Sequence, residues 1–298
     1  MKDHHPTDIS KTEHSQKVWL QEVGPRDGLQ NEPVALAHEI RARLIERLAD
    51  AGLSRIQIGS FVNPRRVPQM AGTEDLWQSL KKKRGVRYSV LVLNQRGLDS
   101  ALAEVIPHME IYVSASETHS QRNSGMSTAK ALRLAARMIS QALEGGRGVT
   151  AGVMCAFGCF YEGTVELGRV LDIIRQFVSA GAVEIGLADT PGLAGPSGVE
   201  AVVDAVADVV SLDRVTLHLH DTRGYGMANL RAALDMGVRQ FDASLGGLGG
   251  CPFIPGAKGN ISTQQTMDTL ESLGYRTGVD RKKLDSIWVD LARVLGQD

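Results

Sequence analysis

The stretch VELGRVLDIIRQFVSAGAVEIGLADT, residues 165–190, contains the pattern that decides the fold. Apolar residues recur every three or four positions over Val165–Ala180, which predicts an amphipathic helix. Ala180-Gly181 supplies a helix C-terminal glycine. The apolar run Val183–Leu187 then predicts a buried parallel strand, and the polar pair Asp189-Thr190 follows it directly.

This unit of strand and helix repeats along the chain. Further strands are predicted at Val18–Val23, Arg55–Ile58, Tyr88–Leu93, Glu110–Val113, Val149–Cys155, Arg214–Leu219 and Gln240–Ala243. Amphipathic helical stretches between them include His38–Ala51, Thr128–Leu143, Gly198–Val210 and Met227–Met236.

Eight such units in about 270 residues match the size of a (β/α)8 TIM barrel, an α/β fold. Additional C-terminal helices are predicted from about Thr263 to the end. A doubly wound open sheet is the alternative fold. No Pro/Gly/Ser-rich linker divides the chain, so one domain is expected over residues 18–298, after a flexible N-terminal tail of residues 1–17.

The composition is that of an ordinary soluble protein, with 43% hydrophobic and 22% charged residues and a formal net charge of −1. A charge this close to zero gives no electrostatic reason to expect nucleic acid or a membrane as partner. No apolar run approaches the ~20 residues that span a bilayer. The N-terminal stretch resembles neither a signal peptide nor a transit peptide, so a cytoplasmic protein is expected.

Polar residues gather where the predicted strands end, and in a TIM barrel those ends build the active site. His218 and His220 are two residues apart, so in a strand both imidazoles point to the same face and can bind one ion. Asp27 and Asn260 can supply oxygen ligands. Two nitrogens and two oxygens fit Mg²⁺, Mn²⁺ or Co²⁺, and the lack of thiolates argues against structural zinc.

Two further residues suit chemistry beside such a metal. Arg26 precedes Asp27 in a Gly-Pro-Arg-Asp-Gly turn directly after a strand, where it can donate hydrogen bonds to an enolate oxygen. A surface ion pair is the alternative, and this position disfavours it. Cys251 lies in the Gly-rich segment 246–259, which can close over a ligand and place a proton donor there. A merely buried cysteine is the alternative.

Several motifs together resemble the 3-hydroxy-3-methylglutaryl-CoA lyase family of TIM-barrel metallolyases. The resemblance covers roughly Val18 to Lys283, and its longest motifs are the first and the last. The motifs are EVGPRDGLQNE (22–32), SFVNP (60–64), VPQM (67–70), YEG (161–163), HLHDT (218–222) and GLGGCPFIPGAKGN (247–260).

The resemblance implies a divalent-metal-dependent retro-Claisen carbon–carbon lyase. It would cleave a 3-hydroxy-3-methylglutaryl-CoA-like thioester to acetyl-CoA and a keto acid such as acetoacetate. The implied metal is Mg²⁺ or Mn²⁺, and the implied assembly is a homodimer or larger. The implied roles are metal binding by Asp27, His218, His220 and Asn260, enolate stabilisation by Arg26, proton abstraction by His218 or Asp27, proton donation by Cys251, and substrate binding by Arg26, Gln30, Gln57 and Asp189.

Two departures from the family pattern qualify the substrate. Gln57 and Gln264 stand where these lyases usually carry Glu. At Gln57 the exchange removes a charge close to Arg26 and the metal. Two other functions therefore stay open: a related metal-dependent aldolase or Claisen-type condensing enzyme acting on a 2-oxo acid, and a non-catalytic CoA-binding relative.

Overall fold

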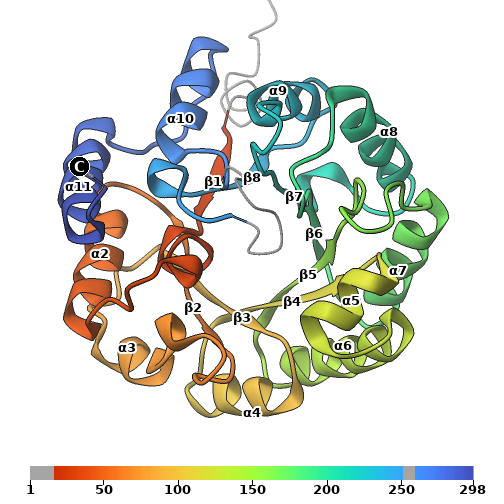
Figure 1. Cartoon of the computed structure of the whole chain (residues 1–298), viewed down its shortest axis with the longest axis horizontal. Helices are drawn as coiled ribbons and strands as arrows, with labels where there is room; N and C mark the ends of the chain where they lie inside the picture. The colour runs from red at the N-terminus through yellow and green to blue at the C-terminus, as the bar shows by residue number, and fades with distance from the viewer. Residues whose placement is uncertain (1–16, 251–258, 298) are drawn as a thin grey trace, which may run out of the picture.

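The computed structural model describes residues 17–250 and 259–297. Within them, eight parallel strands form a closed barrel in which each strand pairs with the next (Figure 1). The last strand pairs with the first, from Trp19 opposite Gln240 to Glu22 opposite Ala243. The predicted TIM barrel is therefore confirmed. The open sheet is wrong, because this pairing leaves no sheet edge.

Each predicted strand overlaps an observed one. The largest difference lies in the second strand, which continues to Phe61 because Gly59 and Ser60 extend the pairing with the third across a bulge. The strands are β1 (Trp19–Glu22), β2 (Arg55–Phe61), β3 (Arg87–Val92), β4 (His108–Ser114), β5 (Gly148–Met154), β6 (Glu184–Ala188), β7 (Val215–His218) and β8 (Gln240–Ala243).

Helices surround the barrel as an outer ring (Figure 1). They are α2 (His38–Asp50), α3 (Thr73–Ser79), α4 (Gln95–Ala103), α5 (Glu117–Ser124), α6 (Thr128–Glu144), α7 (Leu167–Ser179), α8 (Pro196–Ala207), α9 (Gly226–Asp235), α10 (Thr263–Ser272) and α11 (Arg281–Leu295). The last two are the predicted C-terminal helices. α11 packs beside α2, where Arg47 forms a 2.7 Å ion pair with Asp290. The last described helix thus closes the ring against α2.

The interior of the barrel is polar, whereas bulky branched residues usually fill a TIM barrel. Arg87 pairs with Glu184 at 2.7 Å, and His108 Nε2 lies 2.8 Å from the Thr150 hydroxyl. Alternating strand residues point the other way and form the apolar core against the helices. They include the fully buried Ile56, Ile58, Ile111, Leu187 and Phe241.

The predicted tail lies outside the described residues except for Lys17, which forms a β-bridge with Arg276. Among the described helices, none combines the length and the apolar character needed to cross a membrane.

Candidate active site

A short π-helical turn, η1 (Gly24–Gly28), follows β1 directly and carries Arg26 and Asp27. Pro25 suits the start of the turn, at its second residue, because no backbone donor is needed there. The N–H groups of Arg26, Asp27 and Gly28 all donate to the Val23 carbonyl, at 3.0, 2.7 and 3.3 Å. Both charged side chains are buried, so the pair is no surface ion pair.

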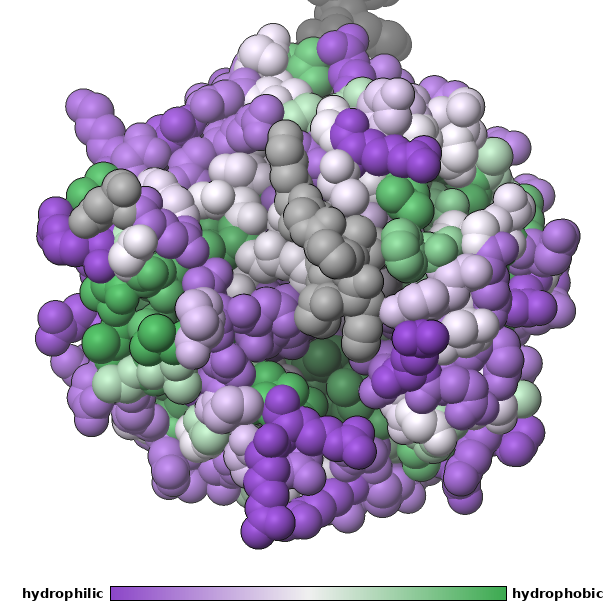
Figure 2. Space-filling view, viewed as in Figure 1, coloured by the Kyte–Doolittle hydropathy of each residue, from purple (hydrophilic) through white to green (hydrophobic). Residues whose placement is uncertain are grey.

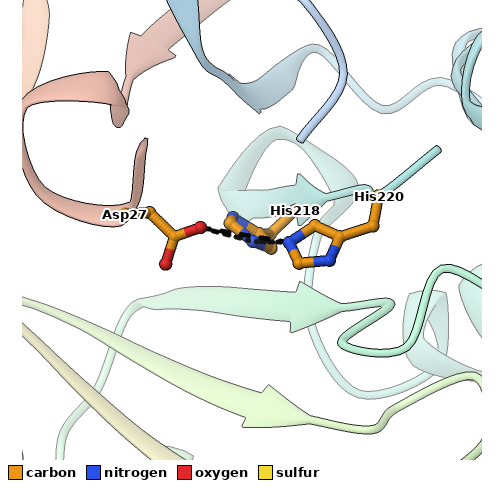
Figure 3. Close-up of side chains that lie close together, drawn as sticks. All are labelled: Asp27, His218 and His220. Atoms are coloured by element: carbon orange, nitrogen blue, oxygen red, sulfur yellow. Dashed lines mark hydrogen bonds and ion pairs between the residues drawn. The ribbon is translucent and has the colours of Figure 1, made fainter. Parts of the chain in front are cut away.

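His218 ends β7, and His220 follows two residues later. Both side chains and Asp27 point toward one another (Figure 3). The Nε2 atoms of the two imidazoles lie 3.0 Å apart, and each lies 3.9 Å from Asp27 Oδ2. One ligand atom from each of the three residues fits within 4.8 Å of the other two. As the strand spacing predicted, the two histidines direct their Nε2 atoms at one point, which Asp27 also faces.

Asn260 joins this group although it lies far along the chain from Asp27. It forms an antiparallel bridge with His220, and Ile261 donates to the Leu219 carbonyl at 3.1 Å, so the chain returns beside the end of β7. Asn260 Nδ2 donates to Asp27 Oδ2 at 2.8 Å and to the Leu248 carbonyl at 3.0 Å. Its buried Oδ1 has no hydrogen-bond partner within the described ranges. All four predicted metal ligands therefore meet.

Gly249 allows this close approach. Its φ of +108° lies in the region that favours glycine. A Cβ atom there would lie 2.6 Å from Asn260 Nδ2 and 3.2 Å from the Asp27 carbonyl oxygen. A side chain at this position would push Asn260 away from Asp27.

The electrostatics of the group suit a cation. Burial alone would raise the pKa of Asp27, but Arg26, His218 and His220 together hold it well below its usual range. Burial and the neighbouring His218 lower the pKa of His220 to about 4, so this imidazole is neutral and able to bind a metal at neutral pH.

Asp242 contacts the side of the His218 ring that faces away from Asp27 and His220. Its Oδ2 lies 3.1 Å from His218 Nδ1. This contact, together with the charge of Asp27, raises the pKa of His218 against the opposing effect of burial. A carboxylate at Nδ1 leaves Nε2 directed at the focus, as is usual for metal-binding histidines.

Arg26 is held between two acceptors, Gln57 Oε1 and Asp27 Oδ1. Gln30 Nε2 also donates to Asp27 Oδ1, at 2.9 Å. The predicted residues Arg26, Gln30 and Gln57 therefore form one connected group with Asp27, the first of the predicted metal ligands.

These residues border a cavity of about 430 Å³. Figure 2, viewed from the same side as Figure 1, shows a hollow in the middle of this face with hydrophobic side chains inside it. The sequence reasoning missed most of its wall. The described lining residues are Arg26, Asp27, Gln30, Asn31, Arg66, Val67, Leu91, Leu93, Tyr112, His119, Asn123, Met154, Ala188, Thr190, His218, His220 and Gly250.

A weak signal for part of the missed wall exists in the sequence. Tyr112 lies two residues after Glu110 on β4, so both face the barrel interior. His119 and Asn123 are four residues apart on α5, which places them on one helix face.

Gln57 and Asp189, which were predicted to bind substrate, are not among the residues that line this cavity. Gln57 lies deeper in the barrel, in the middle of β2. The Asp189 carboxylate accepts backbone N–H bonds from Leu193 at 3.2 Å and Ala194 at 3.1 Å. Gln57 contacts Arg26, and Asp189 holds the backbone of the loop beyond Thr190.

Two further residues of the sequence analysis, Cys251 and Gln264, lie in or next to the Gly-rich segment 246–259. Cys251 lies outside the described residues. Gln264 lies at the start of α10, and its Oε1 accepts from the Gly246 N–H at 3.0 Å and the Ser262 hydroxyl at 3.2 Å. Gln264 therefore holds the beginning of this segment and does not reach the metal ligands.

Comparison with known proteins agrees with this architecture. A family model described as HMGL-like matches residues 17–289. Hydroxymethylglutaryl-CoA lyase YngG of Bacillus subtilis is 39% identical over 279 residues, which is 93% of each chain. (R)-citramalyl-CoA lyase of Chloroflexus aurantiacus is 41% identical over 290 residues, or 94% of this chain and 92% of the relative.

A solved structure also matches. It is that of an HMG-CoA lyase from Acinetobacter baumannii in complex with coenzyme A and 3-methylmalate. It superposes with a TM-score of 0.92 at 36% identity, covering 95% of this chain and 93% of that one. The barrel and the similarity to proteins named as lyases thus define a carbon–carbon lyase. This chain belongs to the HMGL-like family.

Proposed function

We propose that this chain is a divalent-metal-dependent lyase that performs a retro-Claisen cleavage of a 3-hydroxy-3-methylglutaryl-CoA-like thioester. The products would be acetyl-CoA and a keto acid such as acetoacetate. The convergence of Asp27, His218 and His220 beside Arg26, on the wall of one cavity, carries the proposal. The relatives carry the names of two different thioesters, so the acyl group is what an assay has to determine.

The buried donor set fits Mg²⁺ or Mn²⁺. Two imidazole nitrogens and the Asp27 carboxylate face one point, and the unpartnered Oδ1 of Asn260 supplies a fourth donor. Four protein ligands leave room for substrate oxygens in the coordination that these ions prefer. When bound, such an ion supplies Lewis-acid polarisation of the substrate's hydroxyl and carboxylate oxygens.

Arg26 would stabilise the negative charge that develops on the thioester oxygen as the carbon–carbon bond breaks. Its side chain is buried and held by Gln57 and Asp27, so its remaining donors act where water is scarce. His218 or Asp27 would accept the proton of the substrate's hydroxyl. Gln30 would keep Asp27 in place.

Cys251 would return a proton to the enolate carbon. Its neighbour Gly250 supports this role, because Gly250 lines the cavity and its carbonyl accepts from Asn31 Nδ2 at 2.7 Å. Substrate binding by Gln57 and Asp189 is proposed as indirect, through Arg26 and the Thr190 loop. We also propose a homodimer or larger assembly in the cytoplasm, to be tested by light scattering and by fractionation of cells that produce the chain.

The deciding experiment is an assay of Mn²⁺-loaded protein with a panel of 3-hydroxyacyl-CoA thioesters, starting with 3-hydroxy-3-methylglutaryl-CoA. Release of acetyl-CoA that disappears in Cys251→Ser and His218→Ala is expected. Cys159→Ser is the matched control, because Cys159 is a buried thiol that bonds Ser116 away from the described cavity wall. Activity that needs a free 2-oxo acid and no CoA would instead indicate an aldolase or condensing enzyme.

A further inference from the structure

Glu110 is a buried carboxylate inside the barrel that the proposed function does not yet use. It lies on β4 and is 1% exposed. Its Oε1 accepts from Gln21 Nε2 at 3.1 Å and from the Ser89 hydroxyl at 2.6 Å, while Oε2 has no well-directed donor within the described chain. Burial and the charge of Asp242 raise the pKa of Glu110, and Arg26 and Gln57 are close enough to lower it.

Gln57 has an unsatisfied donor, which complements the unsatisfied acceptor of Glu110. An arginine can only donate hydrogen bonds, so Gln57 has to turn its carbonyl oxygen toward Arg26, as the structure shows. Its amide nitrogen then points away from Arg26 and needs an acceptor. That nitrogen is buried and has no well-directed partner in the described ranges, and Glu110 Oε2 is the nearby carboxylate oxygen in need of a donor. A hydrogen bond from the Gln57 amide nitrogen to Glu110 Oε2 would satisfy both groups.

Glu110 also connects to the metal side of the site. Gln21 Nε2 donates both to Glu110 Oε1 and to Asp242 Oδ1, each at 3.1 Å. Asp242 in turn contacts His218 Nδ1. One buried carboxylate thus ends a hydrogen-bonded path that leads through Gln21 and Asp242 to His218.

We propose that Glu110 is a positioning residue: it fixes the orientation of Gln57 and supplies, from β4, a carboxyl group near Arg26 in place of the one that related lyases carry at the position of Gln57. Without Glu110, the Gln57 amide would be free to rotate and present its N–H groups to the guanidinium. This inference rests on the proposed function, and it explains how a neutral Gln57 is compatible with an active site.

The test is a charge exchange between the two positions. Glu110→Gln removes the acceptor that orients Gln57, and Gln57→Glu places two carboxylates against each other. Each single change is expected to lower kcat by about tenfold or more, with a much smaller change in KM, because Arg26 acts on the developing charge. The double variant Gln57→Glu/Glu110→Gln restores one carboxylate and one amide, and kcat is expected to return to within about threefold of wild type.

Glu184→Gln is the matched control, because Glu184 is another carboxylate inside the barrel but pairs with Arg87. It should not rescue Gln57→Glu. Wild-type kcat in Glu110→Gln, or losses that simply add in the double variant, would overturn the inference. Should the wild type cleave no thioester, the proposed function fails alone. Thermal unfolding of the same metal-free variants then tests the contact, which requires non-additive shifts in Tm.

Discussion

At the scale of single residues, Glu22 is a fully buried acid near the site that accepts three hydrogen bonds. Its Oε1 accepts N–H bonds from Gly24 and Leu245, both at 2.8 Å, and its Oε2 accepts from the Thr263 hydroxyl at 2.7 Å. Glu22 thereby ties the turn that carries Asp27 to the segment that carries Asn260. Burial raises its pKa from 4.5 to about 7, although these hydrogen bonds oppose the shift.

The raised pKa of Glu22 predicts a pH-dependent stability. A carboxyl group that binds its proton more tightly in the folded state stabilises the fold fully below pH 4.5, and this contribution is lost as the pH rises to about 7. The size is on the order of 3 kcal/mol. Glu22→Gln should remove this part of the pH dependence. Urea unfolding of both proteins across that interval measures it, and parallel pH curves would contradict the prediction.

Asp242→Asn should weaken metal binding although Asp242 is not a ligand. An asparagine can donate to His218 Nδ1, which would shift the imidazole proton to Nε2 and block the nitrogen that faces the ion. Mn²⁺ affinity is expected to fall by about 10- to 100-fold. Electron paramagnetic resonance titration measures free Mn²⁺ directly. Asp235→Asn, at an exposed acid of α9, is the control and should bind normally.

At the scale of elements, the strands and long helices could be predicted because each has a clear periodicity. The observed α7 lies within Val165–Ala180, and β8 agrees with its predicted bounds. The short helices α3 and α4 were not among the predicted stretches, since seven and nine residues contain only two turns or so of the pattern. The short length of α3 and α4, more than their composition, explains why the sequence did not predict them.

The convergence of Asp27, His218, His220 and Asn260 could be predicted because these residues sit in motifs, whereas the surroundings of Tyr112 and Glu110 could not. Alternation along β4 shows that both face inward, but it does not show which neighbours they meet. Their surroundings depend on pairing: Tyr112 lies opposite Gly152 of β5, which in turn lies opposite Gly186 of β6. Only the closed sheet shows that these glycines make room for the tyrosine ring.

Gly152→Ala should therefore disturb the cavity wall. An added Cβ would collide with the Tyr112 ring, and no flexible chain end is available to give way. Overpacking of this kind costs about 1–3 kcal/mol. Chemical denaturation measures the loss. In a Tyr112→Ala background the same exchange should cost much less, because the ring that the added Cβ meets is gone. Gly168→Ala in α7, where an added Cβ meets no atom within 4 Å, should cause no loss.

At the scale of the whole molecule, the site joins distant parts of the barrel. Asp27 follows the first strand, His218 ends the seventh, and Asn260 lies beyond the eighth. An ion bound by all of them stabilises the folded barrel but not the unfolded chain. Mn²⁺ at about 100 times its dissociation constant should add about 2.7 kcal/mol of stability.

Differential scanning calorimetry with and without Mn²⁺ measures this linkage. If Mn²⁺ binds as proposed, Tm should rise by about 2–4 °C for each kcal/mol in a chain of this size. The increase should vanish in His218→Ala and reverse on chelation. An equal increase in that variant would mean that Mn²⁺ binds elsewhere.

The distance along the chain between Asp27 and Asn260 also has a consequence for synthesis. Their side chains bond across 233 positions of sequence, so a nascent chain that has left the ribosome only as far as β7 carries Asp27 and His218 and lacks His220 and Asn260, two of the four proposed ligands. The pairing of β1 with β8 is equally postponed. If all four residues bind the proposed ion, its high-affinity capture is expected only after translation has passed the last strand.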